Sequence, residues 1–332
     1  MSHLEPPEYE LRRTRYESRH DRPAVPDGYP PAFRPGHDDV ELDLGDRRSR
    51  RAAPPPEPAP NGRAGRNLPA AIGVGSTMGV VVVASLLIWR PAFLFVVALG
   101  AGIGVWEMVR AVGRDDGARP PLVPLLGGAA AMIALAWYAG AEGVTLGLVL
   151  TVLATMVWRL ADGPYRYQRD MLAAILIAVY VPFLGAFAVL LDRPDDGALR
   201  VIVTLVAVVL SDTGGYVAGV FFGRHPMAPT VSPKKSWEGT AGSLVIAATG
   251  SALLFLFGFH VPWWHGAVFG LGVSAASVLG DLGESLLKRD LKIKDMSNLL
   301  PGHGGVMDRL DSVLFAVPTA FVLFSVLAPA AG

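Results

Sequence analysis

The chain has 332 residues, of which 52% are hydrophobic and only 17% charged, and its 29 basic side chains balance its 29 acidic ones. Soluble domains carry about a quarter of charged residues, so this composition excludes an ordinary soluble domain and indicates a membrane protein. The absence of cysteine excludes disulfides, thiolate zinc sites and cysteine nucleophiles. Carboxylates, His and Lys are left to carry any chemistry.

Residues 1–68 are predicted to form a disordered cytoplasmic tail. Stretches such as "RRTRYESRHDRP" and "RAAPPPEPAPNGRAGR" are rich in Pro and charge and show no helical or strand periodicity. The tail is not expected to be a secretory signal, because the first apolar run begins only near Pro69 and is long enough to stay in the membrane. Its arginines could bind a partner or anionic lipid head groups. The favoured interpretation is that the tail is a solvated tether whose acids balance its bases.

Residues 69–332 are predicted to form an all-α, polytopic transmembrane catalytic domain. The apolar segments have about the 20 residues that a spanning helix needs. The first two are separated only by "WRP", which indicates a tight hairpin turn or, alternatively, one bent segment. About nine spans are expected, at 69–89, 91–109, 121–139, 143–159, 171–191, 200–222, 241–259, 265–287 and 312–330.

The short connections between spans predict the orientation. Basic residues gather in every second connection, and basic connections face the cytoplasm. We therefore expect the N-terminus and the loops at 223–240 and 288–311 to face the cytoplasm, with the protein in the cell (inner) membrane.

The lysines indicate where the site lies. The chain uses Arg almost everywhere for positive charge, yet its five lysines all fall in the last two inner loops. Lys is a common point-charge ligand for phosphate. The alternative is that these lysines only mark the cytoplasmic side. They are Lys234, Lys235, Lys288, Lys292 and Lys294.

Carboxylates recur near these lysines with helical spacing. Asp281, Glu284 and Lys288 are spaced to share one helix face, and Asp308 and Asp311 repeat the spacing at the start of the last span. Asp212 is a further acid inside the sixth span. Acids within spans are costly and suggest function. Oxygen ligands without Cys favour Mg²⁺ or another hard cation, although Asp308 alone could be a helix cap.

The run "SLLKRDLKIKDMSNLLPGHGGVMDRLD", from Ser285 to Asp311, carries a resemblance to a known family. It resembles the complete signature of phosphatidate cytidylyltransferase, also called CDP-diacylglycerol synthase. The blocks "SDTGGYVAGVFFGRH" and "SPKKSWEG" are similar to two further blocks of that family, although Ser236 stands where many members have Thr. The resemblance covers the chain in detail from about residue 120 onward.

The resemblance implies a membrane enzyme, usually a homodimer, that joins CTP and phosphatidic acid to give CDP-diacylglycerol and pyrophosphate. Its expected partners are these two substrates and the lipid bilayer, with no nucleic acid. The expected cofactor is Mg²⁺, and the sequence leaves open whether a monovalent cation joins it. The metal ligands carried over are Asp281, Asp308 and Asp311.

The remaining site residues are interpreted from the signature and from their chemistry. Lys234, Lys235, Lys288 and Lys294 are assigned to phosphates. His303 is a candidate to orient a phosphate, or else a loop histidine bonded to backbone. The catalytic set is Lys234, Lys235, Lys288, Lys294, His303 and Arg309. The substrate-binding set is Asp212, Ser232, Glu238, Ser285, Arg289, Asp295, Gly304 and Gly305.

Two other classes of protein share part of this pattern. A polyprenol or dolichol kinase would also be helical, CTP-using and Mg²⁺-dependent, but it would release CDP instead of pyrophosphate. A cation transporter would also bury acids in its spans, but it would not need lysine-rich loops on one side.

Overall fold

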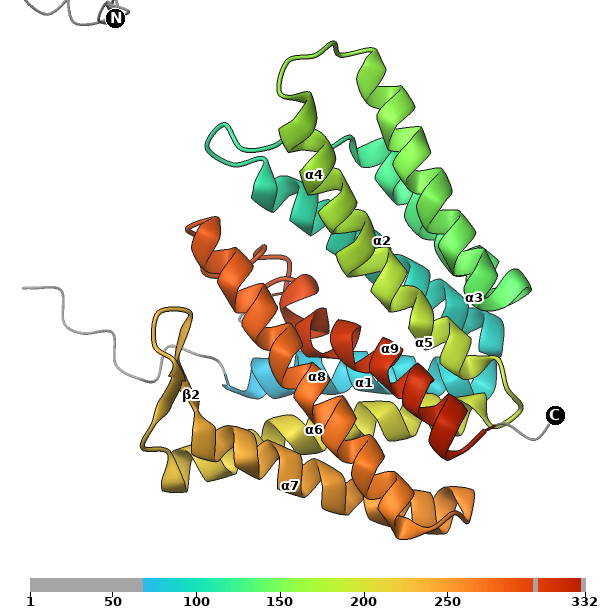
Figure 1. Ribbon diagram of the computed structural model, residues 1–332, viewed down its shortest axis with the longest axis vertical. Coiled ribbons are helices and arrows are strands. Elements are labelled where there is room, and N and C mark those ends of the chain that lie inside the picture. The colour runs from blue at the N-terminus through green and yellow to red at the C-terminus, as the bar shows by residue number, and fades with distance from the viewer. Residues whose placement is uncertain (1–67, 301–303, 330–332) are drawn as a thin grey trace, which may run out of the picture. The chain divides into compact units, whose positions relative to one another are not determined.

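The computed structural model describes residues 68–300 and 304–329. These residues are almost entirely helical (Figure 1), so the predicted all-α membrane fold is confirmed. The predicted tail, except for its last residue, and His303 lie outside the described residues.

Nine α-helices and two π-helical turns make up most of the described chain. The π-helical turn η2 (Val179–Phe183) joins α4 to α5, and η3 (Phe255–Phe259) extends α7. The α-helices are α1 (Leu68–Ile88), α2 (Arg90–Val112), α3 (Leu122–Leu160), α4 (Tyr167–Ala178), α5 (Leu184–Asp192), α6 (Gly197–Phe222), α7 (Trp237–Leu254), α8 (Trp263–Asp290) and α9 (Met307–Leu327).

Seven helices of the described chain are long and apolar enough to cross a membrane. One of them, α3, leaves the helical conformation at Gly140 (φ 68°), and its two arms correspond to the predicted spans 121–139 and 143–159. α1 corresponds to the predicted span 69–89. Its apolar stretch Gly75–Ile88 is shorter than the seven spanning helices. The expected count of about nine is therefore approximate. A helix satisfies its own backbone hydrogen bonds in lipid, so uninterrupted apolar runs become helices.

Two local features differ from the expectation. Residues 223–240 do not form a plain loop, because β1 (Pro226–Ala228) pairs antiparallel with β2 (Ser232–Ser236). Ser236 then caps α7 by accepting a hydrogen bond from Gly239 N (3.1 Å). The last helix begins at Met307, before the predicted start at 312, so Asp308 and Asp311 lie inside its first turns.

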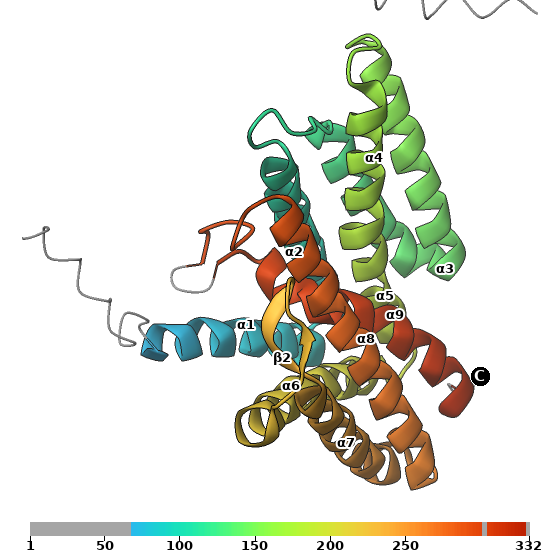
Figure 2. The same ribbon diagram turned by 60° about the vertical axis from the view of Figure 1, so that its left-hand side comes forward.

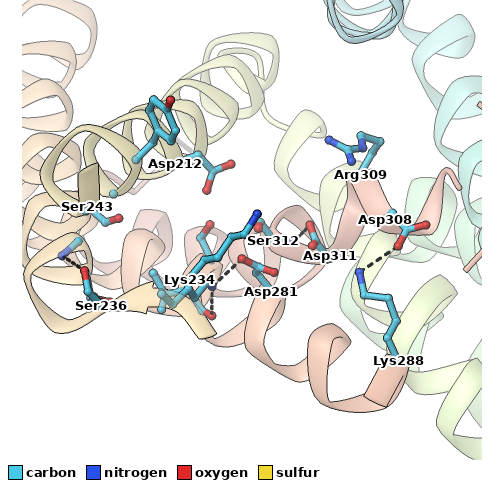
Figure 3. Close-up of a pocket in the computed structure, with 18 of the residues that line it drawn as sticks. Asp212, Lys234, Ser236, Ser243, Asp281, Lys288, Asp308, Arg309, Asp311 and Ser312 are labelled. Atoms are coloured by element: carbon cyan, nitrogen blue, oxygen red, sulfur yellow. Dashed lines mark hydrogen bonds and ion pairs between the residues drawn. The ribbon is translucent and has the colours of Figure 1, made fainter. Parts of the chain in front are cut away.

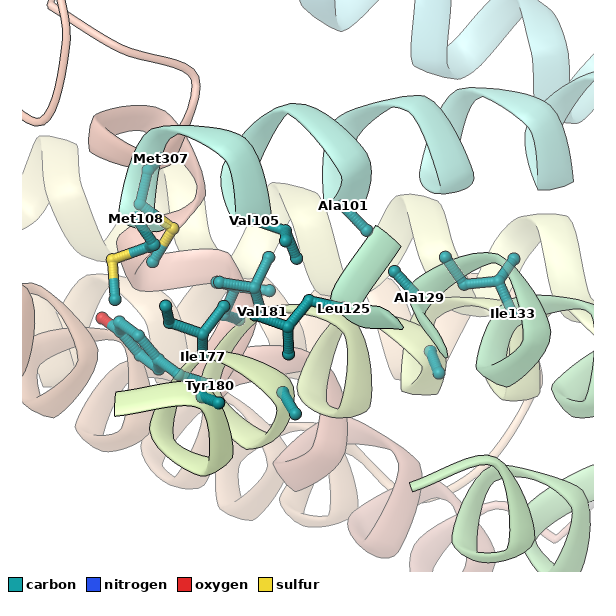
Figure 4. Packing of buried hydrophobic residues seen from close by; sticks show 14 of the residues in the cluster. Ala101, Val105, Met108, Leu125, Ala129, Ile133, Ile177, Tyr180, Val181 and Met307 are labelled. Atoms are coloured by element: carbon teal, nitrogen blue, oxygen red, sulfur yellow. The ribbon is translucent and has the colours of Figure 1, made fainter. Parts of the chain in front are cut away.

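Packing brings the C-terminal helices together. α6 packs against α7, α7 against α8, and α8 against α9, as Figures 1 and 2 show. One buried cluster joins α2, α3, α4 and α9, with Met108 and Met307 near one end (Figure 4). A second cluster contains Phe255 and Phe324, whose rings stack 5.3 Å apart.

Candidate functional site

A cavity of about 460 Å³ opens among α6, β2, α7, α8 and α9. Its volume lies in the range of small-molecule binding pockets. Figure 3 shows side chains from all these elements converging on it, with Lys234 reaching in between Asp212 and Asp281. The sequence-predicted site residues that line the cavity are Asp212, Lys234, Lys235, Asp281, Lys288, Asp295, Asp308, Arg309 and Asp311.

Other predicted site residues lie around the cavity without lining it. Glu238 accepts hydrogen bonds from the backbone of Arg224 (3.1 Å) and His225 (3.2 Å) and contacts the His225 ring, so it supports the hairpin. Arg289 Nε donates to Val231 O (3.3 Å). The members that do not line the cavity are Ser232, Glu238, Ser285, Arg289, Lys294, Gly304 and Gly305.

The two adjacent lysines of β2 have different surroundings. Lys235 Nζ lies 2.6 Å from Asp281 Oδ2 and 3.4 Å from Val278 O. Lys234 is exposed and makes no ion pair among the described residues. A short strand places alternate side chains on opposite faces, yet both lysines line the cavity. Lys234 therefore offers an ammonium to an anionic ligand, whereas Lys235 already neutralises Asp281.

Lys288 takes part in a buried ion-pair group. Its Nζ lies 2.6 Å from Glu284 Oε2 and 2.9 Å from Asp308 Oδ1. The Lys288 side chain is 16% exposed, while those of Glu284 and Asp308 are 0% and 4% exposed. The second oxygen of Asp308 accepts from Met296 N (2.9 Å) and Gly305 N (2.7 Å). Both Asp308 oxygens are thus bonded to donors of the chain itself.

A glycine allows α8 and α9 to approach closely at the acidic part of the cavity. A Cβ at Gly280 would lie 2.5 Å from Asp311 O, so a side chain there would push the helices apart. The close approach brings Asp281, the next residue of α8, to the same cavity as Asp311, as Figure 3 shows. Asp281, Asp308 and Asp311, three of the acids whose helical spacing stands out in the sequence, therefore lie at one cavity.

The charges of the cavity bear on whether a cation fits. Its five carboxylates outnumber its four basic side chains, so a polyphosphate would enter a formally negative site unless cations came with it. Oxygen donors suit Mg²⁺. Asp311 fits that use, whereas Asp281 would have to exchange its contact with Lys235 (2.6 Å) for the ion. Asp308 would first have to release its chain donors, and the described residues hold no preformed group of three acidic or His side chains for a metal. The three-aspartate metal site stays a prediction.

Several residues near the cavity were not predicted. Tyr216, Thr240 and Ser243 line it, and Ser277 Oγ is buried there without a hydrogen-bond partner among the described residues. Glu107 on α2 is fully buried and accepts hydrogen bonds from the start of α9. A signal for Glu107 was present, because it is an acid inside an apolar span. Serines and threonines give no comparable signal, since they are common in membrane helices.

Comparison with known proteins matches residues 69–327 to the cytidylyltransferase family. A phosphatidate cytidylyltransferase of Mycobacterium bovis is 42% identical over 278 residues, covering 80% of this chain and 90% of the relative. The Mycobacterium leprae protein of that name is 44% identical over 282 residues, with the same coverage. The Helicobacter pylori protein of that name is 38% identical over 149 residues, which is 45% of this chain and 56% of the relative.

Proposed function

Because this chain belongs to the cytidylyltransferase family, we propose that it transfers the cytidylyl group of CTP to phosphatidic acid. A phosphate oxygen of phosphatidic acid forms a bond to the α-phosphorus of CTP. The bond from that phosphorus to the oxygen that bridges to the β-phosphate breaks. The products are CDP-diacylglycerol, for phospholipid synthesis, and pyrophosphate, which leaves with the electron pair of the broken bond.

The observation that carries this proposal is the composition of the cavity. Lys234 faces Asp281 and Asp311 within one space of about 460 Å³. An available ammonium and oxygen donors for a hard cation are the groups that a polyphosphate substrate needs. α6, α7, α8 and α9, which line the cavity, are all long and apolar enough to cross a membrane, which suits a lipid substrate.

The reaction depends mainly on how the two substrates are positioned. The phosphate of phosphatidic acid is already an anion, so its attack needs no strong general base. The acceleration comes from placing the attacking and leaving oxygens in line at the α-phosphorus and from neutralising the phosphate charges. Lys234 is placed to bind a phosphate directly. Lys235 and Lys288 act first on Asp281 and Asp308, so they hold the acids in place. Arg309 lines the same cavity and suits phosphate oxygens through its planar guanidinium.

We propose that Asp281 and Asp311 hold Mg²⁺, with Asp308 joining them if its chain donors move. When bound, the ion would neutralise phosphate charge and stabilise the leaving pyrophosphate. A second, monovalent cation would fit the same excess of carboxylates.

The orientation and assembly are part of the same proposal. The N-terminus and both lysine-rich segments face the cytoplasm of the cell, where CTP is available, and the protein lies in the inner membrane. The basic connections support this orientation. We also propose a homodimer, which chemical crosslinking in native membranes would test.

The purified chain in mixed micelles tests the function directly. Pyrophosphate release should require CTP, phosphatidic acid and Mg²⁺ together. Diacylglycerol, which lacks the phosphate nucleophile, is the matched control substrate and should give none. Equal pyrophosphate release with diacylglycerol would reject phosphatidic acid as the nucleophile. CDP as the nucleotide product would reject the proposal and favour phosphoryl transfer to an alcohol.

A further inference from the structure

Glu107 connects α2 to a segment nearly two hundred residues later in the chain. It is fully buried. Its Oε1 accepts hydrogen bonds from Ser297 Oγ (2.6 Å) and Val306 N (3.0 Å), and its Oε2 accepts one from Met307 N (2.7 Å). Hydrogen bonds to a buried charged group are among the stronger ones in proteins.

These hydrogen bonds place the carboxylate at the N-terminus of α9. The first N–H groups of a helix have no partner within the helix, and the helix dipole favours an anion there. Glu107 supplies that anion, so these N–H groups are not available to a phosphate. A Cβ at Gly305 would lie 2.6 Å from both carboxylate oxygens, which explains why glycine precedes the helix.

Asp308 completes the attachment of the same segment. It accepts from Met296 N and Gly305 N, which both belong to the connection between α8 and α9. Met296 and Met307 are buried in the cluster that contains Met108, the neighbour of Glu107 on α2 (Figure 4). Two carboxylates and this packing therefore fix the first turn of α9.

The first turns of α9 carry Asp308, Arg309 and Asp311 into the cavity, whereas Glu107 itself does not line it. We propose that Glu107 is a positioning residue that sets the placement of these three side chains for substrate binding. This inference rests on the proposed function. It extends the functional unit to α2, outside the helices that enclose the cavity.

The test compares Glu107→Gln with the intact chain. The amide is nearly isosteric but turns one acceptor into a donor, so at least one N–H of α9 loses its partner. A shift of about 1 Å in the first turn is enough for large kinetic losses. We expect KM for CTP to rise and kcat to fall, each on the order of tenfold. Glu107→Asp, which keeps the charge on a shorter side chain, should recover part of both.

Asp170→Asn is the matched control for a merely structural effect. Asp170 is also a buried carboxylate, and it pairs with Arg159 (2.7 Å) and accepts from Arg119 N (2.7 Å), away from the cavity. Its substitution should lower stability yet leave KM for CTP unchanged. A smaller fraction of folded enzyme lowers the maximal rate, but it does not change the KM of the molecules that remain folded. An equal rise of KM in both variants would overturn the positioning role.

A second readout needs no substrate. The chain has no cysteine, so Leu299→Cys, at an exposed position in the attached segment, can be labelled alone with a maleimide. Its labelling rate should rise several-fold in the Glu107→Gln background and stay unchanged with Asp170→Asn. If Glu107→Gln does not fold, Ser297→Ala, which removes one of the three hydrogen bonds, should raise KM for CTP by less. Labelling is not compared in this variant, because Ser297 Oγ also accepts a hydrogen bond from Leu299 N (3.1 Å).

The two proposals fail in distinguishable ways. An intact chain without CTP turnover would reject the proposed function, while the labelling rate would still report on Glu107. An active intact chain whose Glu107→Gln variant keeps both its KM for CTP and its labelling rate would overturn the role of Glu107.

Discussion

Replacing Lys288 with Met is expected to destabilise the protein far more than a phosphate-binding role would require. The substitution keeps an unbranched stem but removes the ammonium that lies 2.6 Å from Glu284 and 2.9 Å from Asp308. Two carboxylates that are 0% and 4% exposed would then face each other without a cation. Because both carboxylates are buried, water cannot replace the stabilisation that the ammonium gives to their charges.

The magnitude follows from the burial of the group. Removing one partner of a buried ion pair costs about 3–5 kcal/mol, because the remaining charge is left uncompensated. An exposed pair contributes about 0–1 kcal/mol. Arg119 and Asp116 form such a pair, 3.5 Å apart, with side chains 70% and 86% exposed. Arg119→Met is therefore the matched control, with an expected loss below about 1 kcal/mol.

Equilibrium unfolding in mixed detergent micelles measures both variants. A second substitution, Glu284→Gln in the Lys288→Met chain, removes one uncompensated charge and should restore part of the lost free energy of unfolding. If Lys288→Met lost no more than Arg119→Met but abolished CTP turnover, the ion-pair account would be refuted. Lys288 would then bind phosphate, as the sequence alone predicts.

Three further outcomes are expected. Lys234→Ala should lower turnover by about tenfold or more with little change in unfolding temperature, and Lys234→Arg should rescue only part, because the guanidinium differs in shape; full activity of Lys234→Ala would remove it from the phosphate site. Asp311→Asn should lower turnover by about 100-fold, with no loss of stability because apposed carboxylates repel; unchanged Mg²⁺ dependence would contradict this. Cysteines at Ser232 and Leu299 should react with an impermeant reagent only from the cytoplasmic side, and labelling of intact cells would reverse the orientation.

The helices could be predicted because their cause is local. An apolar run of sufficient length must satisfy its backbone within itself. Every predicted span corresponds to a helix, to one arm of α3, or to α-helix continued by a π-helical turn, as at 171–191 and 241–259. The β1–β2 hairpin could not be foreseen, because strands of three and five residues leave too short a pattern. At the early start of α9, Val306 N and Met307 N donate to Glu107, a distant residue that local spacing does not reveal.

The site was predicted in its residues more than in its contacts. Helical spacing correctly put Glu284 near Lys288, and one cavity is lined by Lys288 together with Asp281, Asp308 and Asp311. The partners of each lysine were not predictable, since they depend on how helices cross. Lys288, which is predicted to bind phosphate, pairs with Glu284 and Asp308 in the structure, so replacing Asp308 should cost stability as well as turnover.

The partition of label from CTP tests the central claim most directly. The purified chain would be given phosphatidic acid, Mg²⁺ and CTP labelled either at the α- or at the γ-phosphorus. We predict that α-label appears in a lipid product identified as CDP-diacylglycerol, while γ-label appears only in pyrophosphate. Transfer of γ-label into a lipid, with α-label left in CDP, would contradict cytidylyl transfer.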